Sequence, residues 1–382
     1  MFFVAFFIIA AACSIITIKT LVGYSDMSFQ ARLATAIIVI LGWLSPIIIS
    51  SLRNITLNYP QFFSFVSKYG YILFGFVFVV FCLLILRDIF WYALYGSAQL
   101  MGIDNWYINP KNISVLGSAN LIVIGLSVAI CGYGLYEANK TPNIVNISDE
   151  TSRINRDWRI VQISDLHINR TTSVDKIRNL VETVNSLGPD VVALTGDIFD
   201  DDASVLQEQI SALGNIGAPY GVYASIGNHE FYNGLSPWLY QYEQLGFTVL
   251  FNKGVSIGGD IFIAGIPDAF TASSNPIHNV NFTHTLAGST LEQYKILLSH
   301  NPELADSISS FNFQMMLSGH THGGQIFPFH IFVKKANRYL SGDYNVNGIK
   351  LHVSNGAGTW GPAMRILAPS EITVIDLIKK DK

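Results

Sequence analysis

Residues 158–167 read WRIVQISDLH, a short apolar run that ends in an Asp-x-His motif. The run from Trp158 to Ser164 predicts a strand, and Asp165 and His167 come where that strand should end. Side chains two residues apart in an extended segment point the same way, so this pair can hold one ion together. The stretch therefore predicts a polar site at the end of a strand.

Four more polar motifs each follow a run that predicts a strand, at 190–195, 221–226, 295–299 and 315–317. These motifs are Gly196-Asp197-Ile198-Phe199-Asp200, Gly227-Asn228-His229-Glu230, His300-Asn301-Pro302 and Gly319-His320-Thr321-His322. In layered α/β folds the carboxyl ends of the strands meet at one edge, where ligands bind. Five separate segments are thus expected to contribute to one cluster.

From about residue 153 onward, short β-branched runs alternate with helical stretches such as the amphipathic segment 174–187. This alternation predicts an α/β layered domain, and about 230 residues suffice for one core. A further strand is expected at 261–264. Histidines 278, 284, 330 and 352 lie outside the motifs and are interpreted as loop or surface residues.

The expected cluster combines carboxylates, an amide and imidazoles, and it contains no thiolate. Such a set suits divalent Mn, Fe, Zn or Mg. A lone Asp or His after a strand is usually a helix cap or a core polar group, but five such motifs in one order favour a metal site. The three cysteines all lie in apolar runs and supply no thiolate zinc site.

The first third of the chain is strongly apolar. The whole chain is 50% hydrophobic and 13% charged, against the roughly 25% charge of typical soluble proteins. Four stretches, 2–18, 33–52, 70–86 and 116–136, approach the roughly 20 apolar residues that a membrane-spanning helix needs. We therefore expect a transmembrane region at 1–140, a linker at 141–155 and a catalytic domain at 156–382.

These spans predict a multi-pass protein of the cell membrane or inner membrane. The first run lacks the preceding Lys or Arg of a signal peptide, so an anchor is the better interpretation. No ionisable residue lies in the middle of a predicted span, which argues against a transporter. Gly132 and Gly134 would permit close helix approach in the fourth span. The side of the membrane and the oligomeric state stay open.

The ordered motifs resemble the calcineurin-like metallophosphoesterases, whose signature is DxH, GDxxD, GNH followed by Glu or Asp, H, and GHxH. The resemblance implies a four-layer α/β/β/α sandwich with two divalent ions. It assigns Asp165, His167 and His322 to the first ion, Asn228, His300 and His320 to the second, and Asp197 to both. It places His229 beside the leaving-group oxygen and makes Asp200 the partner that orients and charges that imidazole.

The segment SGHTHGGQ at 318–325 resembles a membrane-associated subgroup, the transmembrane proteins with a metallophosphoesterase domain. Many soluble relatives carry Arg-Gly after the second Asp of GDxxD, where this chain has Asp201 and Asp202. Arg365 is a candidate replacement that could bind substrate phosphate, or it is an ordinary surface arginine. Residues 235–240 and 327–332 form either an apolar lip near the site or ordinary core.

The leading hypothesis is a membrane-anchored phosphohydrolase that cleaves a phosphoester or pyrophosphate bond. The subgroup resemblance implies a lipid-linked substrate, including UDP-2,3-diacylglucosamine of lipid A biosynthesis. One alternative is a membrane sensor or scaffold that binds a ligand without turnover, and another is a channel or carrier regulated by the soluble domain. The net charge of -4 carries no basic excess, so no nucleic-acid partner is expected.

Overall fold

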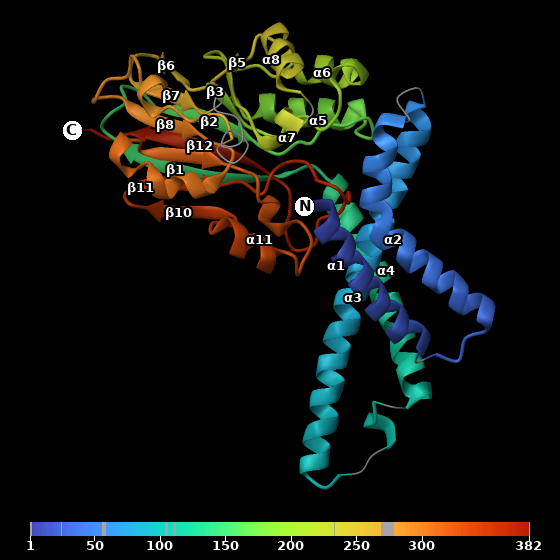
Figure 1. Ribbon diagram of the computed structural model, residues 1–382. Coiled ribbons are helices and arrows are strands. Elements are labelled where there is room, and N and C mark those ends of the chain that lie inside the picture. Colours follow the sequence, from blue (N-terminus) through green and yellow to red (C-terminus); the bar gives the residue numbers. More distant parts are fainter. Residues whose placement is uncertain are drawn as a thin grey trace. The chain divides into compact units, whose positions relative to one another are not determined.

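The computed structural model describes residues 2–23, 25–55, 59–103, 106–110, 112–232, 234–268 and 279–381. The chain forms two compact units (Figure 1). The helical unit comprises Met1–Tyr136 and Gly361–Ile366, and the α/β unit comprises Glu137–Trp360 and Leu367–Lys382. The chain thus leaves the α/β unit for six residues near its end and then returns to it.

Four apolar helices make up most of the helical unit, and each is long enough to cross a membrane. They are α1 (Phe2–Gly23), α2 (Phe29–Ile55), α3 (Pro60–Leu100) and α4 (Ile113–Asn139). Trp43 of α2 packs edge-on against Phe74 and Phe81 of α3, with ring centroids 5.7 and 5.5 Å apart. Every one of the four expected spans falls within one of these helices.

Helix α3 extends well beyond the expected span 70–86. Its 41 residues rise about 60 Å, roughly twice the thickness of a hydrocarbon core. Arg87 and Asp88, which follow the expected span, lie inside this helix. The Arg87 guanidinium bonds to Asp88 and to the side-chain oxygen of Asn120 in α4, whose amide donates to the Thr20 carbonyl at 3.1 Å. The Arg87 guanidinium thus finds its partners inside the helical unit.

The segment Gly361–Ile366 packs on α3 and α4 inside the helical unit. The backbone N–H of Arg365 donates to the Gly134 carbonyl at 2.9 Å. A Cβ on Gly134 would lie 2.9 Å from Ile366 Cγ1, and one on Gly75 would lie 3.0 Å from Met364 Sδ. Gly134 therefore makes room for this segment, where the sequence suggested close approach of another helix.

The first sheet of the α/β unit has the strand order β1-β12-β2-β3-β4-β5. Its strands are β1 (Asn143–Thr151), β2 (Trp158–Ile163), β3 (Val191–Thr195), β4 (Val222–Ser225), β5 (Thr248–Val249) and β12 (Glu371–Lys379). Strands β2 to β5 run parallel, whereas β12 pairs antiparallel with β2. The expected linker 141–155 instead contains β1, which pairs with β12 along all nine of its residues.

The second sheet has the order β10-β11-β9-β8-β7-β6. Its strands are β6 (Lys253–Ile257), β7 (Ile261–Gly265), β8 (Tyr294–Leu298), β9 (Met315–Ser318), β10 (Gly342–Val346) and β11 (Ile349–Val353). The four inner strands are parallel, and both edge strands are antiparallel. The parallel strands β2, β3 and β4 of the first sheet and β8 and β9 of the second direct their carboxyl ends into the loops that carry the motifs.

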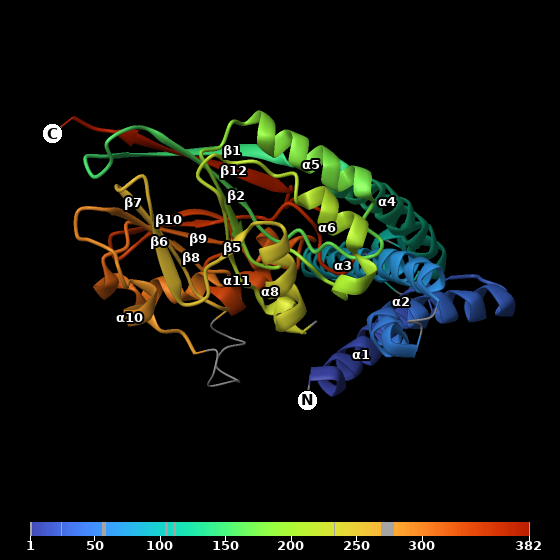
Figure 2. The ribbon, with the colours of Figure 1, turned by 90° about the horizontal axis from the view of Figure 1, so that it is seen from above.

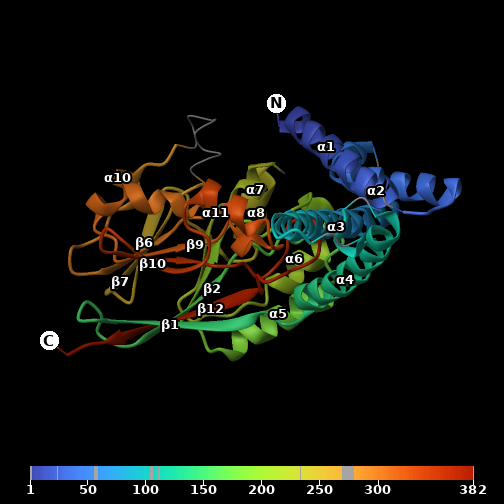
Figure 3. The ribbon, with the colours of Figure 1, turned by 90° about the horizontal axis from the view of Figure 1, so that it is seen from below.

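Helices flank both sheets. They are α5 (Val174–Ser186), α6 (Gln207–Leu213), α7 (Asn228–Tyr232), α8 (Leu235–Gln244), α10 (Phe282–Thr285) and α11 (His330–Asn337). Figure 2 shows α5 and α6 beside the first sheet, and Figure 3 shows α10 and α11 beside the second. The amphipathic α5 begins at Ser173, whose side chain accepts the Lys176 N–H and caps the helix.

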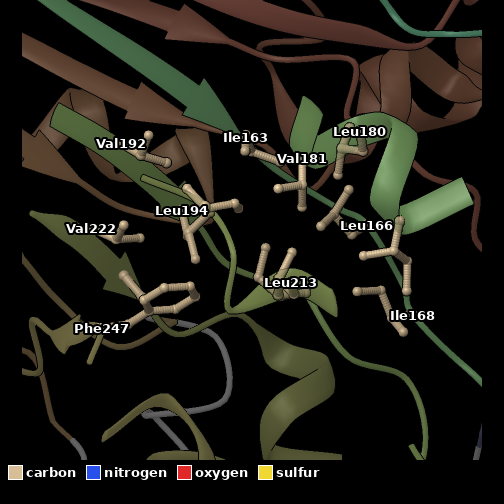
Figure 4. Close-up of a cluster of buried hydrophobic side chains, with 14 of the residues drawn as sticks. Ile163, Leu166, Ile168, Leu180, Val181, Val192, Leu194, Leu213, Val222 and Phe247 are labelled. Carbon is tan, nitrogen blue, oxygen red and sulfur yellow. The ribbon is translucent and has the colours of Figure 1, made fainter. Parts of the chain in front are cut away.

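Successive side chains of a strand face opposite sides of the sheet, so the core of the α/β unit has three layers. In β3, Val192 and Leu194 face the helices α5 and α6 (Figure 4), whereas Val191 and Ala193 face the second sheet. Strand β9 alternates in the same way between the first sheet and the outer face of the second. Strands buried on both faces read as continuous apolar runs, as these do. The result is the expected α/β/β/α sandwich.

His352 differs from the expected surface residue. It lies in β11, is 2% exposed, and its Nδ1 is 2.6 Å from Asp343 of β10. Its Nε2 lies 3.0 Å from Thr373 Oγ1 of β12, so the ring links the two sheets. Burial disfavours the charged ring, but Asp343 and Glu371 outweigh it and raise the pKa of His352 to about 9. His284 is exposed, His330 is half-buried, and residue 278 lies outside the described residues.

Candidate metal centre

Every sequence-predicted ligand follows a parallel strand of one of the two sheets. Asp165 and His167 follow β2, Asp197 follows β3, and Asn228 opens α7 after β4. His300 follows β8, and His320 and His322 follow β9. Gln162 of β2 holds three of these strands together, because its side chain donates to Thr195 Oγ1 of β3 and to the Ser318 carbonyl of β9, each at 2.9 Å.

Asp165, His167 and His322 form the first ligand group. One ligand atom from each lies within 4.8 Å of the other two. The Nε2 atoms of the two histidines are 2.9 Å apart, and His322 Nε2 is 3.3 Å from Asp165 Oδ1. All three residues are buried. Imidazole and carboxylate groups aimed at one point in this way fit a divalent ion.

Asp197, His300 and His320 form the second group, again with ligand atoms within 4.8 Å of one another. His300 Nε2 lies 3.1 Å from Asp197 Oδ2 and 3.3 Å from His320 Nδ1. Asn228 joins them, since its Oδ1 is 3.1 Å from His320 Nδ1. This group therefore brings together the remaining predicted ligands.

In the second group, binding of a cation is coupled to the loss of a proton. Burial opposes charge on the His300 ring, but Asp197 outweighs it and raises the pKa of His300 to about 10. Burial and the neighbouring His300 lower the pKa of His320. A metal ligand must be unprotonated, so metal binding here would release a proton from His300.

Asp197 also belongs to a third set of close ligand atoms, with His167 and His229. Its Oδ2 is 3.8 Å from His167 Nε2 of the first group, besides the 3.1 Å to His300 of the second. The Asp197 carboxylate thus lies between the two groups. This is the position that a ligand shared by two ions requires.

His229 lies at the edge of the cluster with a carboxylate behind it. Its Nδ1 bonds to Asp200 Oδ1, and its Nε2 is 3.9 Å from Asp197 Oδ2. Burial opposes the charged ring, but Asp200 and then Asp197 outweigh it and raise the pKa of His229. Asp200 also contacts a ligand, because its Oδ2 is 3.2 Å from His167 Nδ1. One carboxylate therefore orients both rings.

Five of the predicted ligands occupy the left-handed backbone region. Their φ angles are 53° for Asp165, 47° for His167, 53° for Asp197, 73° for His320 and 51° for His322. Such conformations cost about 1–3 kcal/mol each and gather at functional sites. Two motif glycines keep the space clear, because a Cβ on Gly227 would collide with Asp197 and one on Gly319 would collide with Asp165.

Glu230, the last residue of the motif Gly227-Asn228-His229-Glu230, is a positioning residue to which the sequence assigned no role. Its fully buried carboxylate accepts backbone N–H bonds from Asp197 at 3.1 Å, Ile198 at 2.7 Å and Gly227 at 3.0 Å. It thereby joins the loop after β3 to the loop after β4. The only sequence signal for this role was the acidic residue that follows Gly-Asn-His.

We expect Glu230→Gln to destabilise the fold and weaken metal binding. The amide nitrogen cannot accept these N–H bonds, and each unsatisfied buried donor costs about 1–3 kcal/mol. Thermal unfolding and calorimetric titration with Mn²⁺ measure the two effects, with Glu182→Gln on the exposed face of α5 as the matched control. A metal affinity equal to that of the control would contradict the positioning role.

Asp201 and Asp202 stand where many soluble relatives carry Arg-Gly, and Asp201 forms an ion pair with Arg170. Asp201 accepts two hydrogen bonds from Arg170, both at 2.6 Å, and both side chains are 6% exposed. This pair ties the loop after β2 to the loop after β3. Arg365 is fully buried and belongs to the helical unit, outside the set of ligands brought together in the α/β unit. A substrate contact by Arg365 stays a prediction.

The two apolar stretches considered as a lip differ in exposure. Trp238 of α8 is fully buried and stacks on Phe199 at a centroid distance of 4.2 Å, so it belongs to the core. In the second stretch the exposed fractions are 42% for Phe329, 58% for Ile331 and 64% for Phe332. Most of the exposed apolar surface is therefore on the segment that leads into α11, whereas the first stretch exposes Tyr240.

Comparison with known proteins agrees with this geometry. The pattern of the calcineurin-like phosphoesterases matches residues 159–324. The chain is 33% identical to an uncharacterized metallophosphoesterase of Campylobacter jejuni, over 67% of this chain and 69% of that protein. It is 34% identical to one of Helicobacter pylori, over 70% and 73%.

A third relative, from Danio rerio, is named a transmembrane protein with metallophosphoesterase domain, and it is 31% identical over 67% of this chain and 62% of that protein. Such a relative and the four long apolar helices support a membrane protein. The family binds divalent metals, for which the Asp and His groups offer ligands. The chain belongs to the calcineurin-like phosphoesterase family.

Proposed function

We propose that the protein is a membrane-anchored phosphohydrolase that cleaves a phosphoester or pyrophosphate bond at a binuclear metal centre. The observation that carries this proposal is the Asp197 carboxylate between two ligand groups, with the His229–Asp200 pair beside it. Family membership supports hydrolysis of a phosphorylated substrate. The buried carboxylate, amide and imidazole donors fit two divalent ions of the Mn, Fe, Zn or Mg class.

We assign the seven ligands in two sets that share one member. Asp165, His167 and His322 would hold one ion, Asn228, His300 and His320 the other, and Asp197 both. When bound, such ions stabilise charge on phosphoryl oxygens and activate a water molecule. The protein's own contribution is to fix the ligands, through the strained loop backbones and the Glu230 carboxylate.

His229 is proposed as the group that donates a proton to the leaving oxygen. Its raised pKa favours the protonated ring, and the Asp200 bond to Nδ1 leaves Nε2 as the donor atom. When the phosphorus–oxygen bond breaks, its electron pair stays on the leaving oxygen, and the Nε2 proton neutralises it. Asp200 remains ionised and stabilises the ring throughout.

We further propose a multi-pass protein with a substrate held at the membrane. The four apolar helices support anchoring, and the exposed Phe329, Ile331 and Phe332 would contact lipid or an acyl chain. A lipid-linked phosphoester or pyrophosphate fits this arrangement. The UDP-2,3-diacylglucosamine suggested by the subgroup resemblance is one compound of that class to test.

The test is hydrolysis by the full chain in detergent, stripped of metal and then supplied with Mn²⁺. Bis-p-nitrophenyl phosphate reports the chemistry, and UDP-2,3-diacylglucosamine and phospholipid pyrophosphates report the substrate class. We expect turnover that requires metal. A folded, Mn²⁺-loaded chain that hydrolyses none of these compounds would overturn the proposal in favour of a membrane sensor or scaffold.

A further inference from the structure

Two exposed aromatic rings flank His229, the proposed proton donor. The Tyr232 ring centroid is 5.3 Å from that of His229, and the Trp360 centroid is 6.4 Å from it. Tyr232 is 61% exposed and Trp360 is 50% exposed. Any group bonded to the leaving oxygen lies next to the proton donor, so these two rings border the space it would occupy.

The loops of the metal motifs hold Trp360 in this place. Its backbone N–H donates to Gln325 Oε1 at 2.8 Å, and the Gln325 amide donates back to the Trp360 carbonyl at 2.7 Å. Gln325 lies three residues after the ligand His322. Two residues before Trp360, the Gly358 N–H donates to the Asp165 carbonyl at 2.9 Å. Trp360 is thus connected to the loop that carries His322 and, through Gly358, to the loop that carries Asp165.

Tyr232 is placed by the helix that presents the donor itself. It lies in α7 three residues after His229, one turn along the same short helix that begins with Asn228. Because neither ring is needed to fill the core, each keeps a large apolar face in solvent. A planar group packed against either ring would bury its exposed face, and aromatic stacking adds to the gain from burial.

The distances from His229 favour an ester oxygen as the leaving atom. In the phosphoester of a ring-bearing alcohol, the ring is bonded at or near the leaving oxygen and so lies close to Tyr232 and Trp360. In a pyrophosphate, a phosphate group separates the leaving oxygen from any such ring.

We propose that Tyr232 and Trp360 form a leaving-group subsite for a planar ring, so that the favoured substrate is the phosphoester of a ring-bearing alcohol. This inference rests on the proposed hydrolase function and selects the phosphoester from the two bond types named there. Water attacks phosphorus and loses a proton to solvent, the bond to the leaving oxygen breaks with its electron pair on that oxygen, and the alcohol departs with the proton from His229, which solvent then replaces. Tyr232 and Trp360 are specificity residues whose exposed ring faces contact the departing ring, while the Tyr232 hydroxyl also bonds to the side chain of Asn228.

The test compares two methyl phosphodiesters, one with phenol and one with hexafluoroisopropanol as the leaving group, because these alcohols have similar acidity. The full chain with Mn²⁺ is expected to favour the phenyl ester in kcat/KM by roughly tenfold, the scale of one stacked ring. Trp360→Ala and Tyr232→Ala should each lower that preference several-fold, mainly through KM. Trp360→Phe should retain most of it, because it keeps a ring.

Tyr240→Ala is the matched control, since Tyr240 is a 57% exposed aromatic residue of α8 outside the ligand groups. Calorimetric titration with Mn²⁺ confirms that each variant keeps its metal site. Hydrolysis of both esters with a preference that Trp360→Ala and Tyr232→Ala do not change would overturn the subsite alone. Faster cleavage of methyl diphosphate would also overturn it. Hydrolysis of no compound would overturn the hydrolase function and the subsite together.

Discussion

The full chain with Asp197→Asn is expected to lose both metal ions and nearly all hydrolysis. Asp197 lies between the two ligand groups. Its Oδ2 is 3.1 Å from His300 Nε2 and 3.8 Å from His167 Nε2, so its charge acts on both groups. Bound metal ions stabilise the charge of a phosphoryl transition state by several kcal/mol, which is lost with the ions. At about 1.4 kcal/mol per factor of ten, turnover should fall roughly a thousandfold or more.

Metal content by mass spectrometry and kcat with bis-p-nitrophenyl phosphate measure the two losses. Asp175→Asn is the matched control, because it removes the same charge from an 84% exposed side chain of α5. Asn keeps the size of Asp, so a folded protein is expected in both variants. Two ions bound at the wild-type affinity would show that Asp197 is not their shared ligand.

The second large effect is expected for His229→Ala, which should keep both ions but lose turnover by about 10²–10⁴-fold. His229 is proposed as the proton donor and not as a ligand, so its removal leaves both assigned ligand sets complete. The loss should be greater with phenol as the leaving group than with p-nitrophenol, because the poorer leaving group depends more on the proton.

The matched control for this variant is His284→Ala, which changes an exposed histidine of α10. The measurements are kcat with both leaving groups and metal content. An equal loss with both leaving groups would argue against proton donation, and a loss of metal would assign His229 to the ligands instead.

Much of the α/β unit could be predicted because its strands are buried on both faces. Continuous apolar runs such as 191–195 mark β3, and the polar residues that follow such runs fall at the carboxyl ends of parallel strands. The structure brings Asp165, His167 and His322 together from two strands that are far apart in the sequence. The order of the motifs was sufficient to predict this assembly.

The features that the sequence did not predict depend on contacts that a single sequence does not show. Strand β1 exists because β12, more than 200 residues later, pairs with it in register from Asn143 to Thr151. Arg87, which follows the expected span 70–86, lies within helix α3, where Asp88 and Asn120 bind its guanidinium. His352 is buried because Asp343, Thr373 and Glu371 surround it. In each case a distant or unforeseen partner changes what the local sequence suggests.

The return of the chain to the helical unit limits how this protein can be divided. A fragment that begins near residue 150 would lack most of β1 and would leave the edge of β12 open along the sheet. It would also lack Gly75 and Gly134, against which Met364 and Ile366 pack, and so would expose these two side chains to water. The helical unit and the α/β unit are therefore not independent segments of sequence, and an exchange of the helical unit between relatives must include the matching six-residue segment Gly361–Ile366.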